Sequence, residues 1–202
     1  MVEPSRYRVS DKAAGINNGI LINKLGIKDQ KKLDSAETLL LADTYSHFFE
    51  LLNKNKIQFD LSLLFAIHQY FFEPLYDWAG KIRTVNISKD KMFFAPTEFL
   101  DKVLEKFAKF LKTELLKSPT SKNDLARKLA VIHNEFNVIH PFREGNGRTI
   151  RLFLDLLAVN FGYNPIDWGK KSRVIYFEAC ARGARGNHEA IIKIIKNGLK
   201  KQ

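Results

Sequence analysis

The stretch from His140 to Arg151 reads His-Pro-Phe-Arg-Glu-Gly-Asn-Gly-Arg-Thr-Ile-Arg, and it decides the fold because it joins two apolar, helix-like runs, 125–139 and 150–161. Gly145 and Gly147 flank an asparagine, so the backbone can turn there through conformations that other residues avoid. Successive N–H groups in such a turn form a concave anion site. A helix that begins just after the turn adds its positive N-terminal end to the same place. The stretch therefore predicts an anion site between two buried helices.

Charged side chains around this turn indicate that the anion is a phosphate-bearing ligand. Arg148 and Arg151 are three residues apart and share one face of a helix, where their forked donors match phosphate oxygens. Glu144 would repel a phosphate unless a cation lay between them, and Mg²⁺ typically binds one or two carboxylates together with substrate phosphates. His140 is a base whose ordinary pKa of about 6.5 suits proton removal near neutral pH. Together these residues predict phosphoryl or nucleotidyl transfer to a hydroxyl group.

The same stretch matches the signature of the Fic family, His-x-Phe-x-(Asp/Glu)-Gly-Asn-Gly-Arg-x-x-Arg, at every defined position. The chain resembles this family from about Asn23 to its end. The resemblance implies an all-α Fic fold, a helical bundle with a short β-hairpin flap over the active site. It also implies an enzyme, a protein adenylyltransferase that transfers AMP from ATP to a Ser, Thr or Tyr hydroxyl of a target protein and releases pyrophosphate.

The resemblance also implies a role for each residue of the signature. His140 deprotonates the target hydroxyl, and Glu144 holds Mg²⁺ between the α- and β-phosphates. Arg148 neutralises charge on the α/β side, and Arg151 holds the γ-phosphate. The turn that cradles the phosphates consists of Gly145, Asn146 and Gly147.

Four further residues are given no part in the chemistry. We expect Phe142 to be buried and to fix the loop, and Arg143, at a variable position, to face solvent. His68 and His133 lie within apolar helical patterns, which favour packing or core hydrogen bonding over chemistry.

Residues 81–94 differ in character from the helical segments around them. They mix β-branched and turn-forming residues, which predicts a short hairpin turning at 86–90, with an irregular surface loop as the alternative. In the Fic family the corresponding hairpin lies over the active site and docks a segment of the target by strand addition. The resemblance therefore makes these residues candidates for positioning the target: Thr84, Val85, Asn86, Ile87, Ser88, Lys89, Asp90 and Lys91.

Apolar periodicity predicts a succession of helices along the whole chain. The first runs to about Leu52, and the second ends at Pro74. We expect one Fic domain over 1–202, with a core of about 34–200 and an N-terminal extension of 1–33. The residues expected to begin the helices are Asp34 or Ser35, Asp60, Thr97, Asp124 and Ser172.

The whole-chain composition indicates one globular domain. The chain has 202 residues, of which 45% are hydrophobic, enough for one well-buried core. Cys180 is the single cysteine, which excludes an intrachain disulfide and fits a reducing compartment. Met1–Gly15 lacks the apolar core of a signal peptide, and no apolar run is long enough to span a membrane. We expect a cytoplasmic protein without a membrane partner.

The formal net charge of +11 favours nucleic acid, an acidic partner or ATP as a ligand. The lysines are scattered, as on solvated helix faces, and no nucleic-acid-binding motif accompanies them. We therefore expect ATP rather than nucleic acid, and strongly salt-dependent binding to random DNA would overturn this expectation.

The region after the signature helps to hold the adenosine in Fic relatives, which makes Tyr176 and Asn187 candidate nucleotide contacts. Relatives often carry Gly-Asp where this chain has Gly186-Asn187. Relatives that act as protein kinases carry a Lys in place of Gly147, so the intact glycine argues against kinase activity. Phosphocholine transfer from another nucleotide remains an alternative. A catalytically silent nucleotide-binding protein is a second, although the intact His140 speaks against it.

Many Fic proteins carry an inhibitory helix, (Ser/Thr)-x-x-x-Glu-(Gly/Asn), whose Glu pairs with the second arginine of the signature. This chain offers only Ser46-His47-Phe48-Phe49-Glu50-Leu51, in which Leu51 breaks the pattern inside an expected core helix. We interpret it as a coincidence. Either such inhibition is absent, or a separate small antitoxin supplies the helix, and we hypothesise the second.

Overall fold

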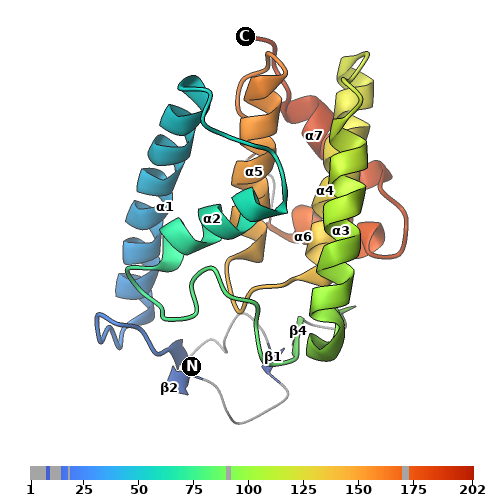
Figure 1. The fold of residues 1–202 in the computed structure, drawn as a ribbon. Coiled ribbons are helices and arrows are strands. Elements are labelled where there is room, and N and C mark those ends of the chain that lie inside the picture. Colours follow the sequence, from blue (N-terminus) through green and yellow to red (C-terminus); the bar gives the residue numbers. More distant parts are fainter. Residues whose placement is uncertain (1–7, 10–14, 18, 90–91, 170–172) are drawn as a thin grey trace.

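The computed structural model is a helical bundle with short strands at one end (Figure 1). The structure describes residues 8–9, 15–17, 19–89, 92–169 and 173–202. Its elements are β1 (Arg8–Val9), β2 (Ile16–Asn17), β3 (Ile20–Leu21), α1 (Gln30–Asn53), α2 (Leu61–Phe72), β4 (Ile87–Lys89), β5 (Met92–Phe93), a 3₁₀ turn (Thr97–Phe99), α3 (Leu100–Leu115), α4 (Lys122–Ile139), α5 (Asn146–Asn160), α6 (Arg173–Gly183) and α7 (Glu189–Gly198).

Helices α4 and α5 form the centre of the bundle, and the loop between them carries the signature stretch. In α4 the residues at helical spacing are fully buried, as the sequence predicts: Leu125, Leu129, Ile132 and Phe136. Helix α5 is buried on nearly every side because α1, α2 and α4 all pack against it. Each buried leucine or phenylalanine contributes roughly 1.5–3 kcal/mol. This packing fixes both ends of the loop between α4 and α5.

Two helix starts differ from the sequence-based prediction. The cap of α1 is Asp29, whose side chain accepts a hydrogen bond from the N–H of Lys32 at 2.8 Å, and not Asp34 or Ser35. The first turn of α1 is polar, so its periodicity is weak there. Thr97 begins a 3₁₀ turn without a side-chain cap, and α3 follows from Leu100. The Asp60 cap is confirmed, and Ser121, three residues before Asp124, caps α4. Ser172 lies outside the described residues.

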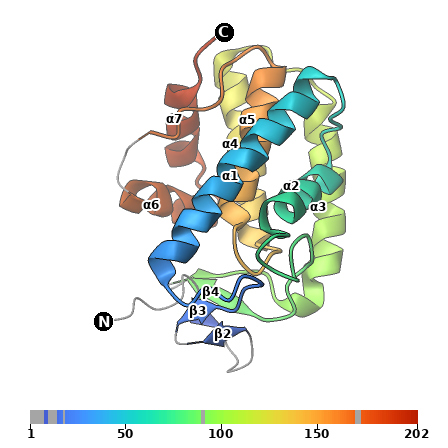
Figure 2. The same ribbon diagram turned by 90° about the vertical axis from the view of Figure 1, so that its left-hand side faces the viewer.

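The strands gather at the end of the bundle that carries the loop between α4 and α5 (Figure 2). Strands β4 and β5 pair antiparallel, with Ser88 opposite Phe93, and this confirms the expected hairpin. The predicted turn at 86–90 is wrong in part, because Ile87–Lys89 is strand. Asp90 and Lys91 lie outside the described residues.

Strand β1 adds a third strand to this hairpin, which the sequence did not predict. Arg8 lies opposite Ser88 and Val9 opposite Ile87 in an antiparallel pairing, so the sheet order is β1-β4-β5. Strands β2 and β3 form a separate hairpin. The all-α fold with a hairpin flap is therefore confirmed, with an extra strand on the flap. Within the described ranges, no helix is long and apolar enough to cross a membrane.

Candidate active site

The loop between α4 and α5 is held in two left-handed backbone conformations. His140 ends α4 with φ of 52°, and Gly145 precedes α5 with φ of 80°. A Cβ at Gly145 would come within 2.1 Å of the Phe72 ring, so both the backbone and the packing require glycine there. The Asn146 side chain closes the loop, because its Oδ1 accepts from Phe142 N at 2.9 Å and its Nδ2 donates to Phe142 O at 2.8 Å.

This closed loop places the start of α5 at the expected anion turn. The first N–H groups of a helix have no partner within the helix, and they point out of its N-terminus. Gly147 lies in this first turn, and a Cβ built on it would meet no heavy atom within 4 Å. The turn thus provides backbone donors beside open space, as an anion site requires.

His140 is buried, at 5% exposure, and its ring is fixed on two sides. Nδ1 lies 3.0 Å from the carbonyl oxygen of Asn137, which can only accept, so the hydrogen is on Nδ1 and the lone pair on Nε2. The Phe94 ring stacks on the imidazole at a centroid distance of 3.8 Å. Burial lowers the pKa of His140 to about 3, opposed by the bond to Asn137, so the ring is neutral at pH 7.

Glu144 is buried, at 6% exposure. Its Oε1 accepts from Gly145 N at 3.0 Å and lies 3.5 Å from Nη2 of Arg148. Behind it, Gly80 N donates to Nδ1 of His68 at 2.9 Å, which leaves Nε2 of His68 to donate to Glu144 O at 3.0 Å. Burial lowers the pKa of His68 to about 3, so this bridge stays neutral, as a structural histidine would.

The two arginines of the signature point to different parts of the protein. Arg148 Nη1 donates to Oε2 of Glu37 at 2.5 Å, and its guanidinium lies over the rings of Phe71 and Phe72. The Arg151 guanidinium instead lies 5.4 Å from the ring centroid of Tyr176 in α6. Arg148 is thus tied to α1 and α2, whereas Arg151 is on the α6 side. The aromatic rings that the two guanidinium groups contact therefore belong to different elements, α2 for Arg148 and α6 for Arg151.

Arg83 anchors the flap to the loop, and sequence reasoning missed it. Its Nε donates to His140 O at 2.8 Å, its Nη1 donates to Val85 O at 2.9 Å, and its Nη2 donates to Ala95 O. The backbone N–H of Arg83 also bonds Pro141 O at 2.8 Å. No motif marks this arginine. Its burial, at 4% exposure, is visible only once the flap and the loop are placed together.

A pocket of about 400 Å³, including its open mouth, lies between the flap, the start of α5 and α6. Lys89 of β4 reaches across it, with Nζ 3.5 Å from the centroid of the Phe177 ring in α6. The pocket unites the catalytic candidate His140 with Gly147 of the anion turn and with Tyr176. Its lining consists of Lys89, Phe94, Asn137, His140, Gly147, Tyr176, Phe177 and Cys180.

Of the two nucleotide contacts predicted after the signature, Tyr176 lines the pocket and Asn187 does not. Tyr176 lines the pocket, and its hydroxyl lies 2.7 Å from Nε2 of His133, a buried histidine that supports it. Asn187 is exposed and is not among the pocket residues; its Oδ1 accepts from Glu189 N at 3.1 Å, at the start of α7. Arg143 is 6% exposed, so the expectation that it faces solvent is wrong. Phe142 is fully buried, as expected.

The residues at the turn could bind Mg²⁺ only when nucleotide phosphates supply further ligands to the ion. Across the described ranges, no group of three or more His, Cys, Asp or Glu side chains could hold a metal ion. Glu144 supplies a single carboxylate beside the start of α5. One or two carboxylates with substrate phosphates is the donor set that Mg²⁺ typically has in nucleotide sites. The donor set therefore agrees with a nucleotide-borne Mg²⁺.

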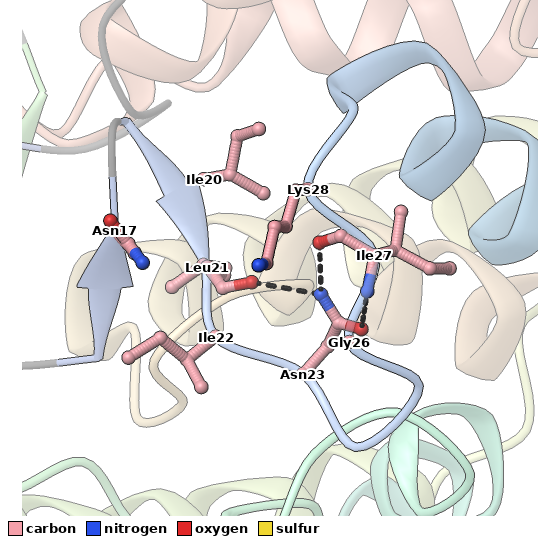
Figure 3. A pocket seen from close by; sticks show the side chains of 8 residues that line it. All are labelled: Asn17, Ile20, Leu21, Ile22, Asn23, Gly26, Ile27 and Lys28. Atoms are coloured by element: carbon pink, nitrogen blue, oxygen red, sulfur yellow. Dashed lines mark hydrogen bonds between the residues drawn. The ribbon is translucent and has the colours of Figure 1, made fainter.

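A second pocket lies away from the signature loop, between the β2–β3 hairpin and the turn that follows it (Figure 3). The Asn23 side chain holds this turn, because its Nδ2 donates to Leu21 O and Ile27 O and its Oδ1 accepts from Ile27 N. All lining residues fall within 17–28, and most of them are apolar. The same segment packs onto the buried cluster around Phe71 and Phe72. We interpret this pocket as part of the support beneath the turn.

Comparison with known proteins places the chain among proteins with this signature. The model of the Fic/DOC family matches residues 58–158. The protein adenylyltransferase VbhT of Bartonella schoenbuchensis is 35% identical over 90% of this chain, which spans 37% of that protein. The probable protein adenylyltransferase y4lH of Sinorhizobium fredii is 32% identical, with 83% of this chain and 85% of that protein covered.

Solved structures share the same fold. The BepC protein of Bartonella tribocorum with bound AMPPNP has a TM-score of 0.77 at 23% identity, and the match covers 93% of this chain and 97% of that one. The N-terminal Fic domain of a cell filamentation protein of Bartonella quintana, with bound ADP, has a TM-score of 0.76 at 24% identity. That match covers 92% of this chain and 93% of the other.

Proposed function

Because the chain belongs to the Fic/DOC family, we propose that it is a protein adenylyltransferase that transfers AMP from ATP to a Ser, Thr or Tyr hydroxyl of a target protein. Relatives that bear this activity in their names match most of the chain. The observation that carries the proposal is His140, which lines one pocket with Gly147 and has its Nε2 lone pair fixed by the Nδ1 bond to Asn137 O. The proposal treats 1–202 as a single Fic domain.

The proposed reaction uses His140 as its base. The target hydroxyl donates its proton to Nε2 of His140 while its oxygen attacks the α-phosphorus of ATP. The new O–P bond forms as the bond from the α-phosphorus to the oxygen that bridges the α- and β-phosphates breaks, and pyrophosphate leaves with the electron pair. His140 is neutral before the step because burial lowers its pKa to about 3. The negative triphosphate raises this value when it binds, which strengthens the base.

The phosphates would be held by the start of α5 and by Arg151. Backbone N–H groups of Asn146 and Gly147 would supply donors. Gly145 N, which bonds Glu144 in this structure, would join them once Glu144 holds Mg²⁺, and Mg²⁺ when bound neutralises charge on the α- and β-phosphates. Arg151 would reach the γ-phosphate. Arg148 would neutralise charge on the α/β side of the triphosphate. Its Nη1 donates to Glu37, whereas its buried Nη2 lies 3.5 Å from Glu144 Oε1 and has no hydrogen-bond partner among the described residues. Tyr176 lies in the pocket wall and would contact the nucleoside.

A target protein would dock on the flap by strand addition. Lys89 of β4 lines the same pocket as His140, so a segment paired along the flap runs past the catalytic ring. Main-chain pairing does not depend on the target's side chains, which suits an enzyme that must fix the backbone around one hydroxyl.

Incubation with ATP labelled at the α-phosphate, Mg²⁺ and bacterial lysate tests this function. We expect a labelled protein band that is absent with His140→Ala. An unchanged band with His140→Ala would contradict the proposal, and label supplied only by a phosphocholine-bearing nucleotide would favour the alternative chemistry. Mass spectrometry of the labelled band identifies the modified residue.

We also hypothesise a small antitoxin that restrains the enzyme, since Ser46–Leu51 lies within α1, where Glu50 pairs with Lys54. An unrestrained transferase would harm the cell that makes it. Co-expression with the neighbouring reading frame should yield a complex that co-purifies and lacks labelling activity. A free and fully active protein from that co-expression would remove the hypothesis.

A further inference from the structure

The flap carries three strands although the hairpin itself supplies only two. Strand β4 is the middle strand, with β5 on one side and β1 on the other. The chain after β5 is bound to the helical body, because Ala95 N donates to Val138 O at 3.2 Å and Ala95 O accepts from Arg83. Strand β4 also carries Lys89 of the pocket that contains His140, so we take the outer edge of β4 as the edge that a target segment would use. In this structure β1 lies on that edge.

We propose that the N-terminal segment of this chain acts as an intramolecular competitor that occupies, through β1, the flap edge on which a target protein docks. The proposal rests on the proposed function, because it takes strand addition at β4 as the way in which the target binds. Arg8 opposite Ser88 and Val9 opposite Ile87 fix the register of the competitor.

The position of β4 explains why this occupancy affects catalysis. Ile87 is buried with Phe94, whose ring stacks on His140 at 3.8 Å, and Lys89 lines the pocket that contains His140. A strand on the outer edge of β4 lies about 4.8 Å from it. Two backbones cannot hold that place at once, so a target must displace β1 before its hydroxyl reaches the base.

The pairing is short, which makes it displaceable. Strand β1 has two residues, and a backbone hydrogen bond contributes about 1 kcal/mol net. The segment is tethered close to the flap, so its effective concentration is high without any further contact. A competitor of this kind reduces the binding of target segments that pair weakly with β4, and target segments that pair strongly displace it. We expect its removal to raise labelling of targets on the order of fivefold.

Removal of the segment leaves the hydrophobic clusters of the described residues with all their members. The buried clusters of the described residues begin with Leu33, and the N-terminal residues packed against them begin with Ile20. Deletion of 1–14 removes β1 and leaves every residue of these clusters in the chain. Val9→Pro in the full chain is a milder second variant, because proline removes a backbone donor from the strand. Val2→Pro, outside β1, is the matched control.

The experiment has two readouts, of which the first does not depend on catalysis. Amide hydrogen exchange of Ile87–Lys89 is measured by NMR in the full chain, the deletion variant and the two proline variants. Labelling of lysate proteins with ATP labelled at the α-phosphate is measured with the same proteins. A synthetic peptide with the sequence of residues 1–14 is then added to the deletion variant, with a scrambled peptide as the control.

The proposal expects faster exchange in β4 and stronger labelling for the deletion variant and Val9→Pro, with Val2→Pro like the full chain. The peptide, but not its scrambled form, should restore slow exchange and lower the labelling. Unchanged exchange in the deletion variant would overturn the occupancy of the edge. Faster exchange with unchanged labelling would overturn the competition. Absence of labelling from every variant would refute the proposed function and, with it, the competition, a result distinct from labelling that does not change.

Discussion

At the scale of single residues, His140 combines burial with a fixed tautomer. The Nδ1 bond to Asn137 O and the stacked Phe94 ring hold the imidazole before any ligand binds. A base that is already oriented avoids the cost of reorganisation during the reaction. His68, by comparison, is fully buried, bonds backbone groups through both nitrogens, and is not among the residues that line the pocket.

The pKa of His140 gives a direct prediction. Burial disfavours the charged imidazolium, so the ring in the free protein should titrate near pH 3, well below its ordinary value near 6.5. An NMR pH titration, with the His140 signal assigned by its loss in His140→Ala, measures this. A midpoint near 6.5 would contradict the buried position of the ring.

Arg83 gives a second prediction at this scale. Arg83→Ala leaves several backbone carbonyls without their donor, and each buried unsatisfied group costs about 1–3 kcal/mol. We expect a loss of at least about 2 kcal/mol in the free energy of unfolding, together with weaker labelling because the flap is released. Urea unfolding checks the first effect. Arg127→Ala, at an exposed position of α4, is the control and should change stability by less than about 0.5 kcal/mol.

The sequence predicts the residues of the signature well and their distant partners poorly. His140, Glu144 and Gly147 could be named because they lie within one short motif with a known chemical logic. Arg83 and Glu37 contact that motif from segments far away in the chain, and no local pattern marks them. The direction of the Arg148 side chain could not be predicted for the same reason. Helical spacing places Arg148 and Arg151 on one face of a helix, but it does not reveal that the Glu37 carboxylate lies next to Arg148.

At the scale of elements, the turn into α5 distinguishes its two glycines. Gly145→Ala forces a positive φ on alanine and places a Cβ 2.1 Å from Phe72, so we expect a loss of about 2 kcal/mol or more in the free energy of unfolding. Gly147→Ala lies within the helix with open space around its Cβ, so its stability should be unchanged or higher.

The variants Gly145→Ala and Gly147→Ala distinguish an effect on protein stability from an effect on ATP binding. Gly147 lines the pocket, and the open space beside it is where the nucleotide would lie. A methyl group at this position would occupy that space, so Gly147→Ala should weaken ATP binding at least tenfold while the protein stays folded. Calorimetric titration with ATP and Mg²⁺, beside thermal unfolding of both variants, measures this. Equal ATP affinity in Gly147→Ala and in the unchanged chain would show that the nucleotide lies elsewhere.

Most elements could be predicted from periodicity, and the exceptions have physical reasons. The polar first turn of α1 hid its start at Gln30, because only Leu33 in that turn is buried. Strand β1 could not be predicted, since two residues carry no periodicity and its partner β4 lies far along the chain. The flap hairpin was recognisable by its composition, but its register was not.

At the scale of the whole molecule, the buried histidines should make stability depend on pH. Burial lowers the pKa of His68 and His140 to about 3 and of His133 to about 4, so below about pH 6.5 the unfolded chain binds more protons than the folded one. Stability should therefore fall as the pH drops from 7 to 5. Burial raises the pKa of Asp155 to about 6, which offsets part of the loss because the folded state binds that proton more tightly.

Urea unfolding at pH 7 and pH 5 checks this balance. Three histidines outweigh one aspartate, so we expect the free energy of unfolding to be lower at pH 5 by a few kcal/mol. Equal or greater stability at pH 5 would mean that the three imidazoles are not buried as the structure has them.

The central claim is that His140 directs a target hydroxyl to the α-phosphorus of ATP in the pocket between the flap, α5 and α6. Parallel reactions with ATP labelled at the α-phosphate and ATP labelled at the γ-phosphate test it most directly. The account predicts protein-bound label from the α-position only, lost in His140→Ala. Protein-bound label from the γ-position, or α-label that survives His140→Ala, would contradict it.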